Sequence, residues 1–308
     1  MRLLLTGASG FVGSHVLPVL AATFPEATLI GCGEAAGMER LALADAAAAR
    51  ALVARARPAG IVHLAAIAAP LAARRDPARA WAVNHAGTIA LAHALAETVP
   101  GAAFVFASSA EIYGRSFRGE PLNEAAPLAP LNPYAATKAA ADLALAAIPG
   151  IVAVRLRPFN HTGPGQSADF AVPAFARQIA RIAAGLQPPV MQVGRLDTAR
   201  DFLDVRDVAR AYALALRQAL AGSRGVFNIA SGTTRPIGEV LTSLLARAGI
   251  TARIDSAAGT GEPEIATPRG DASAARAVLG WAPAIGWETT LGDVLADWRD
   301  RAHRESQQ

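Results

Sequence analysis

Three glycines at every third position follow the first apolar run of the chain. Leu3–Thr6 is that run, and Gly7, Gly10 and Gly13 come directly after it. In such a place the first glycine permits a tight turn, the second lets backbone approach a pyrophosphate, and the third lets a helix pack closely on the strand. A helix that begins here also presents free N–H groups to phosphates. The pattern predicts a strand, a turn and a helix that bind a dinucleotide.

Short apolar runs alternate with longer helical patterns through the first half of the chain. The runs are apolar at every position, which is typical of strands buried on both faces. This alternation predicts right-handed crossovers and therefore an α/β Rossmann fold with a doubly wound parallel sheet. The expected strands are Leu3–Thr6, Thr28–Cys32, Ile61–Ala65, Ala103–Ser109 and Ile151–Arg157, and the clearest helices are Asp76–Thr98 and Asn132–Ile148.

The regular alternation of apolar runs and helical patterns ends after Pro158. A loop rich in glycine and proline precedes a helical pattern over residues 170–184, and a last helical pattern covers 288–301. One further strand is expected at Gly225–Ala230. We predict a dinucleotide-binding domain of residues 1–158 with a return segment near 203–230, and a smaller α/β C-terminal substrate domain of residues 159–202 and 231–308.

The composition limits the classes of partner. The net charge is +4, but the arginines are scattered and form no aromatic–basic patch, so no nucleic-acid partner is expected. No apolar run reaches membrane-spanning length, and Gly7 interrupts the N-terminal run too early for a signal peptide, so we expect a cytoplasmic protein without a membrane partner. The single cysteine, Cys32, excludes an internal disulfide and a cysteine-based zinc site, and no metal site is expected.

Only one of the 29 lysine and arginine residues is a lysine, Lys138. Tyr134 precedes it by one helical turn, which puts a phenol and an ammonium on the same face. A fixed positive charge lowers the pKa of a phenol from its ordinary value of about 10. The pair therefore predicts a proton donor or acceptor for a carbonyl or alcohol carbon, and a compact lysine charge also reaches ribose hydroxyls.

Polar residues follow the fourth expected strand, at the edge of the sheet where parallel sheets bind ligands. Ser109 is placed to hydrogen-bond a reacting oxygen and orient it. Glu111 has three interpretations: a base, a group that binds a substrate hydroxyl, or a solvated loop carboxylate.

The end of the second expected strand bears on the choice of cofactor. An acidic residue there holds the ribose 2′-OH of NAD, whereas a nearby arginine accepts the 2′-phosphate of NADP. The chain has the neutral Cys32 at this place, followed by Gly33 and Glu34. A neutral residue at this position does not repel the 2′-phosphate of NADP, but it supplies no cation to bind that phosphate either. The residue is therefore compatible with NADP or NAD, and NADP is favoured.

A set of motifs resembles the extended short-chain dehydrogenase/reductases, the NAD-dependent epimerase/dehydratase family. The motifs are Gly7-x-x-Gly10-x-x-Gly13, His63-Leu64-Ala65-Ala66, Asn84, Ser108-Ser109 with Tyr113-Gly114, Tyr134-x-x-x-Lys138, Arg157-Pro158-Phe159-Asn160, Phe227-Asn228-Ile229-Ala230-Ser231-Gly232 and Leu279-Gly280-Trp281. The stretches over 157–166 and 200–208 look most like the GDP-4-keto-6-deoxy-mannose reductases. Relatives of this kind commonly dimerise through the helices that match Asp76–Thr98 and Asn132–Ile148, so the resemblance implies a homodimer.

The resemblance also implies roles for individual residues. Ser109, Tyr134 and Lys138 would form a catalytic triad, with Glu111 as a further catalytic or substrate-binding group. Asn160 and Arg200 would contact a nucleotide-sugar. The implied cofactor-binding set is Gly7, Gly10, Phe11, Val12, Gly13, Leu43, Leu64, Ala65, Ala66, Asn84, Tyr134 and Lys138, with Asn84 supporting Lys138 through backbone and water.

Two features depart from the family pattern. Many relatives carry an aspartate for the adenine where this chain has Ala42-Leu43. The reductases carry an Arg-Pro pair where this chain has Gly261-Glu262-Pro263-Glu264. The arginine that would bind the diphosphate or nucleotide is therefore absent, and Arg269 and Arg253 are candidate substitutes for it.

The expected activity is therefore reduction of a nucleotide-bound 4-keto-6-deoxyhexose, most favourably a GDP-sugar, with hydride going to sugar C4 and Tyr134 as proton donor. A 4-epimerase would retain tightly bound NAD, and a 4,6-dehydratase would use Glu111 to remove the C5 proton. A non-catalytic dinucleotide sensor explains the glycine turn but gives no reason to keep Tyr134 and Lys138.

Overall fold

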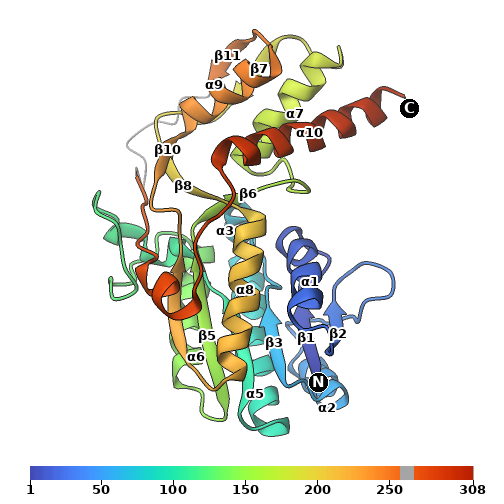
Figure 1. Cartoon of the computed structure of the whole chain (residues 1–308), viewed down its shortest axis with the longest axis vertical. Helices are drawn as coiled ribbons and strands as arrows, with labels where there is room; N and C mark the ends of the chain where they lie inside the picture. The colour runs from blue at the N-terminus through green and yellow to red at the C-terminus, as the bar shows by residue number, and fades with distance from the viewer. Residues whose placement is uncertain (257–266, 308) are drawn as a thin grey trace.

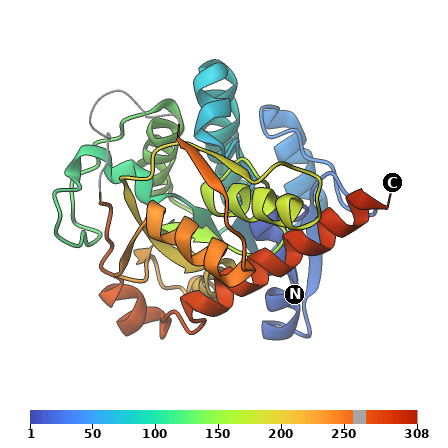
Figure 2. The same cartoon turned by 90° about the horizontal axis from the view of Figure 1, so that it is seen from above.

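The computed structural model describes residues 1–256 and 267–307. The molecule has a larger lower part, which contains the N-terminus, and a smaller upper part, which contains the C-terminus (Figure 1). Seen from above, the helices of the upper part lie across one end of the central sheet (Figure 2).

The larger part is built on a central parallel sheet. Within the described residues this sheet has six strands in the order β2-β1-β3-β4-β5-β9, and every neighbouring pair is parallel. The strands are β1 Arg2–Thr6, β2 Thr28–Cys32, β3 Gly60–His63, β4 Ala102–Ala107, β5 Ile151–Pro158 and β9 Gly225–Ile229. The order reverses between β1 and β3, as in a doubly wound Rossmann-like fold, which confirms the predicted fold class.

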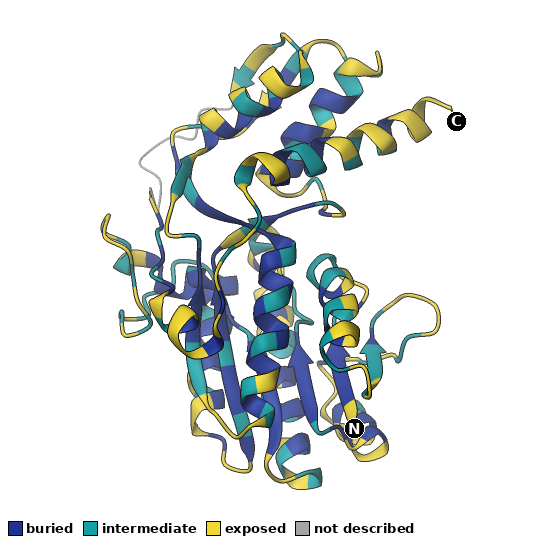
Figure 3. Ribbon diagram, in the orientation of Figure 1, coloured by how far each residue is buried: buried dark blue, intermediate teal, exposed yellow. Residues whose placement is uncertain are grey.

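Helices cover both faces of this sheet. The helices of this part are α1 Phe11–Thr23, α2 Ala46–Ala56, α3 Pro70–Arg75, α4 Pro77–Ala80, α5 Thr88–Thr98, α6 Pro133–Ala147 and α8 Val205–Leu220. α1 and α8 pack on one face, and α2, α5 and α6 pack on the other. A separate hydrophobic core lies on each face of the sheet, and successive residues of β4 point into one or the other. Val105 packs in the core with α8, whereas Phe104 and Phe106 pack in the core with α5 and α6. Buried residues therefore run through the strands, with exposed ones on the outer helices (Figure 3).

The expected helix over Asp76–Thr98 is helical throughout in the structure and contains a π-helical segment. The side chain of Asp76 accepts a hydrogen bond from the N–H of Arg79, and Pro77 occupies the first turn of α4, so a new helix begins there. A π-helical segment, η1 Trp81–Gly87, then joins α4 to α5. The sequence pattern did not reveal this π-helical segment, since the backbone stays in the right-handed helical region at both of its ends.

The smaller part has its own hydrophobic core. Its elements are α7 Ala171–Ala183, β7 Val190–Val193, α9 Ile237–Ala248, β11 Arg253–Ser256 and α10 Trp287–Ser306, and β7 pairs with β11 in parallel. A three-stranded sheet of β6 Asn160–Thr162, β8 Ala199–Asp204 and β10 Thr234–Pro236 joins the two parts in the order β10-β8-β6. A second π-helical turn, η3 Ala275–Leu279, packs with Trp281 against the core of the larger part. The division into two domains at the boundaries given above stays a prediction.

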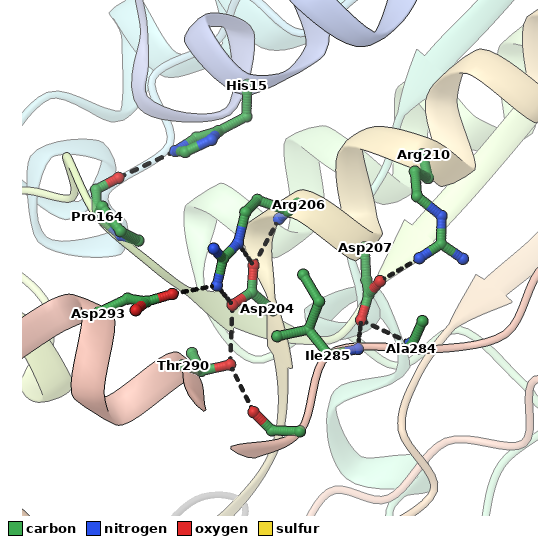
Figure 4. Close-up of polar contacts among 11 residues, drawn as sticks. His15, Pro164, Asp204, Arg206, Asp207, Arg210, Ala284, Ile285, Thr290 and Asp293 are labelled. Carbon is green, nitrogen blue, oxygen red and sulfur yellow. Dashed lines mark hydrogen bonds and ion pairs between the residues drawn. The ribbon is translucent and has the colours of Figure 1, made fainter. Parts of the chain in front are cut away.

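A network of charged side chains fixes α10 to the end of β8 (Figure 4). Asp204 caps α8 by accepting from the N–H of Arg206, and Arg206 Nη2 lies 2.7 Å from both Asp204 Oδ2 and Asp293 Oδ2. Thr290 Oγ1 donates to the same Asp204 oxygen at 2.8 Å. Because Asp204 is fully buried, these partners satisfy a charge that would be costly alone, and they set the position of β8 above the sheet.

Among the described helices, none combines the length and the apolarity that crossing a membrane requires.

Candidate active site

The glycine turn after β1 is too crowded for side chains. Gly7 adopts φ +73°, and a Cβ added to it would lie 2.8 Å from the backbone N of Ala65. A Cβ on Gly13 would lie 2.0 Å from the carbonyl oxygen of Gly7. The N-terminus of α1 at Gly10 has no side-chain cap, so its first N–H groups, including those of Phe11, face outward from the turn. These features fit a bound pyrophosphate.

Cys32 ends β2 and is buried. Burial raises the pKa of its thiol to about 11, with a further increase from Glu39 and a decrease from Arg55. Glu39 and Arg55 form an exposed ion pair at 2.7 Å. The residue at the end of β2 is therefore uncharged at neutral pH, as the sequence indicated.

A buried imidazole links the ends of β1 and β3. His63 Nδ1 and Thr6 Oγ1 lie 2.7 Å apart, and His63 Nε2 and Thr88 Oγ1 lie 2.9 Å apart. Burial, together with the positive charge of Lys138, lowers the pKa of His63 to about 3, so the ring is neutral. Thr6 also accepts from the N–H of Ala65 at 3.3 Å, which holds the Leu64–Ala66 segment beside the glycine turn.

Asn84 lies in η1 and is fully buried. Its side chain accepts from the N–H of Ile67 at 2.8 Å and donates to the carbonyl of Ile67 at 3.1 Å. It also donates to Thr137 Oγ1 at 3.2 Å, next to Lys138 in the chain. Close by, a Cβ on Gly87 would lie 2.3 Å from the carbonyl oxygen of Leu43, which brings the Leu43 segment against η1.

Tyr134 lies in the first turn of α6, whose N-cap is Asn132. The phenol is buried, and the hydroxyl of Ser109, from the loop after β4, lies near enough to lower its pKa. Burial and then the negative charge of Glu111 raise the pKa of Tyr134 above its ordinary value, and the effect of Ser109 offsets only part of this. Tyr134 is consequently protonated at neutral pH and available as a proton donor.

Lys138 does not act on Tyr134 as the sequence suggested. Its Nζ donates to the carbonyl of Ala107 at 2.7 Å and lies 4.8 Å from the centre of the Phe106 ring. Burial lowers the pKa of Lys138 to about 7. The expectation that Lys138 lowers the pKa of Tyr134 is wrong for this structure, because burial and Glu111 dominate the environment of the phenol.

Glu111 is held in place by another side chain. Asn132 Nδ2 donates to Glu111 Oε2 at 3.0 Å, and the charge of Glu111 acts on both Tyr134 and Arg200. This arrangement excludes the interpretation of Glu111 as a freely solvated loop carboxylate. Burial lowers the pKa of Arg200, and Glu111 partly reverses that shift.

The structure thus brings Ser109, Glu111, Tyr134 and Arg200 to one place at the carboxyl edge of the sheet. Asn160 is exposed on β6 and pairs in register with Phe202, two residues along β8 from Arg200. The sequence analysis did not single out Asn132, although an asparagine directly before Pro133 is a recognisable helix cap.

Arg253 and Arg269, the candidate substitutes for the arginine of the Arg-Pro pair, have different surroundings in the structure. Arg253 lies on β11, is exposed and pairs with Asp255. Arg269 Nη2 is 3.4 Å from the carbonyl of Gly119 and 3.8 Å from Glu120. The stretch 261–264 lies outside the described residues. Within residues 1–256 and 267–307, no three potential metal-ligating side chains cluster.

Comparison with known proteins gives matches along nearly the whole chain. The model of the NAD dependent epimerase/dehydratase family matches residues 3–230. The GDP-6-deoxy-D-mannose reductase of Pseudomonas aeruginosa is 35% identical over 310 aligned residues, which cover 99% of each chain.

Solved structures agree with these matches. The structure of RMD from Pseudomonas aeruginosa complexed with NADPH has a TM-score of 0.86 at 35% identity, covering 97% of this chain and 99% of that one. The UDP-glucose 4-epimerase of Thermus thermophilus in complex with NAD has a TM-score of 0.83 at 29% identity, again covering 97% and 99%. The chain is therefore similar to a reductase and to an epimerase that act on sugar nucleotides.

Proposed function

The chain belongs to the NAD dependent epimerase/dehydratase family, and from this we propose that it reduces a nucleotide-bound 4-keto-6-deoxyhexose. It is an NAD(P)-dependent enzyme of nucleotide sugars. The GDP-sugar is the proposed substrate because the reductase of Pseudomonas aeruginosa matches 99% of the chain. NADP is proposed over NAD because Cys32 is uncharged at the end of β2 and because the similar reductase structure is a complex with NADPH.

The residues fit a bound dinucleotide, because the glycine turn leaves room only for backbone and the N-terminus of α1 is uncapped. When bound, the reduced nicotinamide supplies the hydride that sugar C4 receives. Gly7, Gly10 and Gly13 bring backbone to the pyrophosphate, with Phe11 and Val12 at the helix start. The segment Leu64–Ala66, together with Leu43 and Asn84, lines the neighbouring edge of the sheet.

Tyr134 donates the proton that completes the reduction. As C4 gains a hydride, its carbonyl oxygen gains negative charge, and the phenolic O–H transfers its proton to that oxygen. Ser109 lies beside the same phenol, and we assign it to hydrogen-bond and orient the reacting oxygen. The phenolate that remains takes up a proton from solvent. Lys138, one helical turn further along α6, is assigned to the ribose hydroxyls of the dinucleotide, where its compact charge supplies hydrogen-bond donors.

The nucleotide-sugar is held by groups at the rim of the site. Arg200 carries a positive charge, half buried and within the field of Glu111, and we assign it to the substrate diphosphate. Asn160 presents its amide from β6, and Glu111 accepts hydrogen bonds from sugar hydroxyls while Asn132 holds it.

One observation carries the reductase assignment: the phenol of Tyr134 is buried at the start of α6 near Ser109 and Glu111, where it can donate a proton to a reacting oxygen. The test is incubation of the purified protein with NADPH and GDP-4-keto-6-deoxy-mannose, followed by the loss of nicotinamide absorbance and by analysis of the sugar product. Absence of oxidation with this and with related keto-sugars would overturn the assignment.

An epimerase or a dehydratase is the second candidate, favoured by the similarity to the UDP-glucose 4-epimerase of Thermus thermophilus and by the placement of Glu111. Purified protein that contains stoichiometric, non-exchanging NAD would support it. A non-catalytic dinucleotide sensor is supported if Lys138→Ala leaves every turnover and binding property unchanged.

We also propose that the protein forms a homodimer through the face that α4–α5 and α6 share. Large apolar side chains on this side of the sheet are exposed to solvent. Trp81 in η1 is 42% exposed, and Leu143 in α6 is 58% exposed. Light scattering after gel filtration tests this, and a monomer at micromolar concentration would contradict it. A cytoplasmic location stays a prediction.

A further inference from the structure

Arg235 is the register partner of Arg200 across the antiparallel pair of β10 and β8. Directly opposite residues of such a pair project from the same face of the sheet. Two arginines on one face repel each other unless an anion lies between them. The sequence analysis assigned no role to Arg235.

Aromatic rings hold the guanidinium of Arg235 in place. It lies 4.9 Å from the centre of the Trp287 ring, which in turn stacks on Phe202 with centroids 5.3 Å apart. Trp287 thus fixes the position of the cation while leaving its N–H edge open. Arg235, Ser231 and both rings line a cavity of about 240 Å³.

The side-chain Nε–H of Arg235 is not used by the protein. This nitrogen is buried and has no acceptor within the described part of the chain. Burial lowers the pKa of Arg235, and the charges of Glu288 and Asp201 only partly oppose this. A buried donor without an acceptor is costly, so the site favours any anion that supplies oxygen atoms.

The neighbouring carboxylates all have other partners. Asp201 accepts from the backbone N–H groups of Ser231, Gly232 and Gly270. Glu288 pairs with Arg247 at 2.6 Å. Asp204, which also lines the cavity, is neutralised by Arg206. Among the described ion pairs, none therefore includes Arg235.

We propose that Arg235 binds the diphosphate of the nucleotide-sugar, as a second cation beside Arg200. This inference rests on the proposed function. A guanidinium matches phosphate oxygens with two parallel N–H bonds, and two arginines on one face of a strand pair suit a diphosphate with two charged groups. Arg235 then supplies the positive charge that is absent from the stretch Gly261-Glu262-Pro263-Glu264, where the resemblance led us to expect an Arg-Pro pair.

The experiment measures nucleotide binding by calorimetry without turnover. GDP, UDP and dTDP are each titrated into the wild type and into Arg235→Gln, Arg235→Lys and Arg299→Gln. Arg299 is the matched control, because it is an exposed arginine on α10 of the smaller part, where it reaches the carbonyl of Ala248. Guanosine, which lacks phosphates, is titrated as a second control, and thermal unfolding of each variant shows whether it is folded.

The expected result is a dissociation constant for the preferred diphosphate that rises by about tenfold or more in Arg235→Gln, since hydrogen bonds to charged groups are the strong ones. Arg235→Lys restores part of the loss, and Arg299→Gln changes nothing. Guanosine binds wild type and Arg235→Gln alike.

Three outcomes overturn the inference. If the wild type and folded Arg235→Gln bind the diphosphate with equal affinity, the inference about Arg235 fails, while the proposed function is unaffected. A matching loss for guanosine shows that Arg235 only supports Trp287. If the wild type binds none of the three nucleotides, the proposed function fails, and the inference fails with it.

Discussion

The side-chain amide of Asn132 donates a hydrogen bond of 3.0 Å to the carboxylate of Glu111, while its carbonyl oxygen caps α6 by accepting from the N–H of Ala135. One residue thus joins the loop after β4 to the first turn of the helix that carries Tyr134. The distance between Glu111 and the phenol, and with it the acidity of the phenol, depends on this residue.

Asn132→Ala is expected to lower both stability and activity. Loss of an N-cap costs about 1 kcal/mol of unfolding free energy, and Glu111 loses the partner that positions it. Asn132→Asp is the matched control, because an aspartate still caps the helix but repels Glu111. Urea unfolding should find Asn132→Asp close to wild type, while its kcat falls as in Asn132→Ala. Full activity of Asn132→Asp would show that the contact with Glu111 is unimportant.

Tyr134→Phe is expected to lower kcat by on the order of a hundredfold to ten-thousandfold, because the general acid is lost. Binding of NADPH should weaken far less than kcat falls, since the ring stays in place and only the hydroxyl is lost. Tyr113→Phe removes another buried hydroxyl, which bonds to Asn228 and Arg157, and should affect stability more than kcat. Steady-state kinetics and fluorescence titration separate these effects. A Tyr134→Phe enzyme with normal kcat would require another proton donor.

Glu111→Gln is expected to shift the alkaline limb of the rate profile to lower pH. The carboxylate raises the pKa of Tyr134, so its removal lowers that pKa, and the phenol loses its proton at a lower pH than in the wild type. A proton donor then becomes inactive earlier as the pH rises. The profile of kcat/KM against pH measures the shift. A reductase should otherwise retain most of its rate, whereas a dehydratase would lose its activity completely.

Lys138 makes stability depend on pH in a definite direction. Its pKa falls from 10.5 to about 7 on burial, so between these values the unfolded chain binds more protons than the folded one. Stability therefore rises with pH across this window, and the cost of burying the charge is greatest below pH 7. Lys138→Met should remove this contribution. The difference in unfolding free energy between wild type and Lys138→Met, measured from about pH 6 to about pH 10, should favour the wild type increasingly as the pH rises, at roughly the rate of one titrating group. A flat difference would mean that the lysine stays charged.

Cys32→Asp is expected to change the cofactor preference. A carboxylate at the end of β2 accepts the ribose 2′-OH of NAD and repels a 2′-phosphate, so the KM for NADPH should rise by about tenfold or more relative to NADH. Cys32→Ser is the neutral control and should leave the ratio near the wild-type value. Kinetics with both reduced cofactors give the answer, and an unchanged ratio in Cys32→Asp would place the ribose away from this strand.

Much of the fold could be predicted from local patterns in the amino-acid sequence. The glycine spacing after Leu3–Thr6 and the continuous apolar runs predicted the central sheet, because buried strands and tight turns impose their chemistry on neighbouring residues. The strand ends were less certain. β3 ends at His63 and β4 at Ala107, two residues before the expected ends, because Leu64, Ala65, Ser108 and Ser109 leave the sheet to line its carboxyl edge.

The sequence by itself determined the α/β class, the dinucleotide turn and the pairing of Tyr134 with Lys138 one helical turn later, since each depends on spacing along a single element. Only the tertiary structure decided the electrostatics of the site. The pKa of Tyr134 is raised because the surrounding core buries the phenol and because Glu111, from a separate loop, adds a negative charge, while Lys138 bonds to Ala107. Arg235 meets Arg200 only through the register of two strands that are far apart in the chain. Burial and cross-strand register arise from contacts between distant segments, and no pattern within either segment records them.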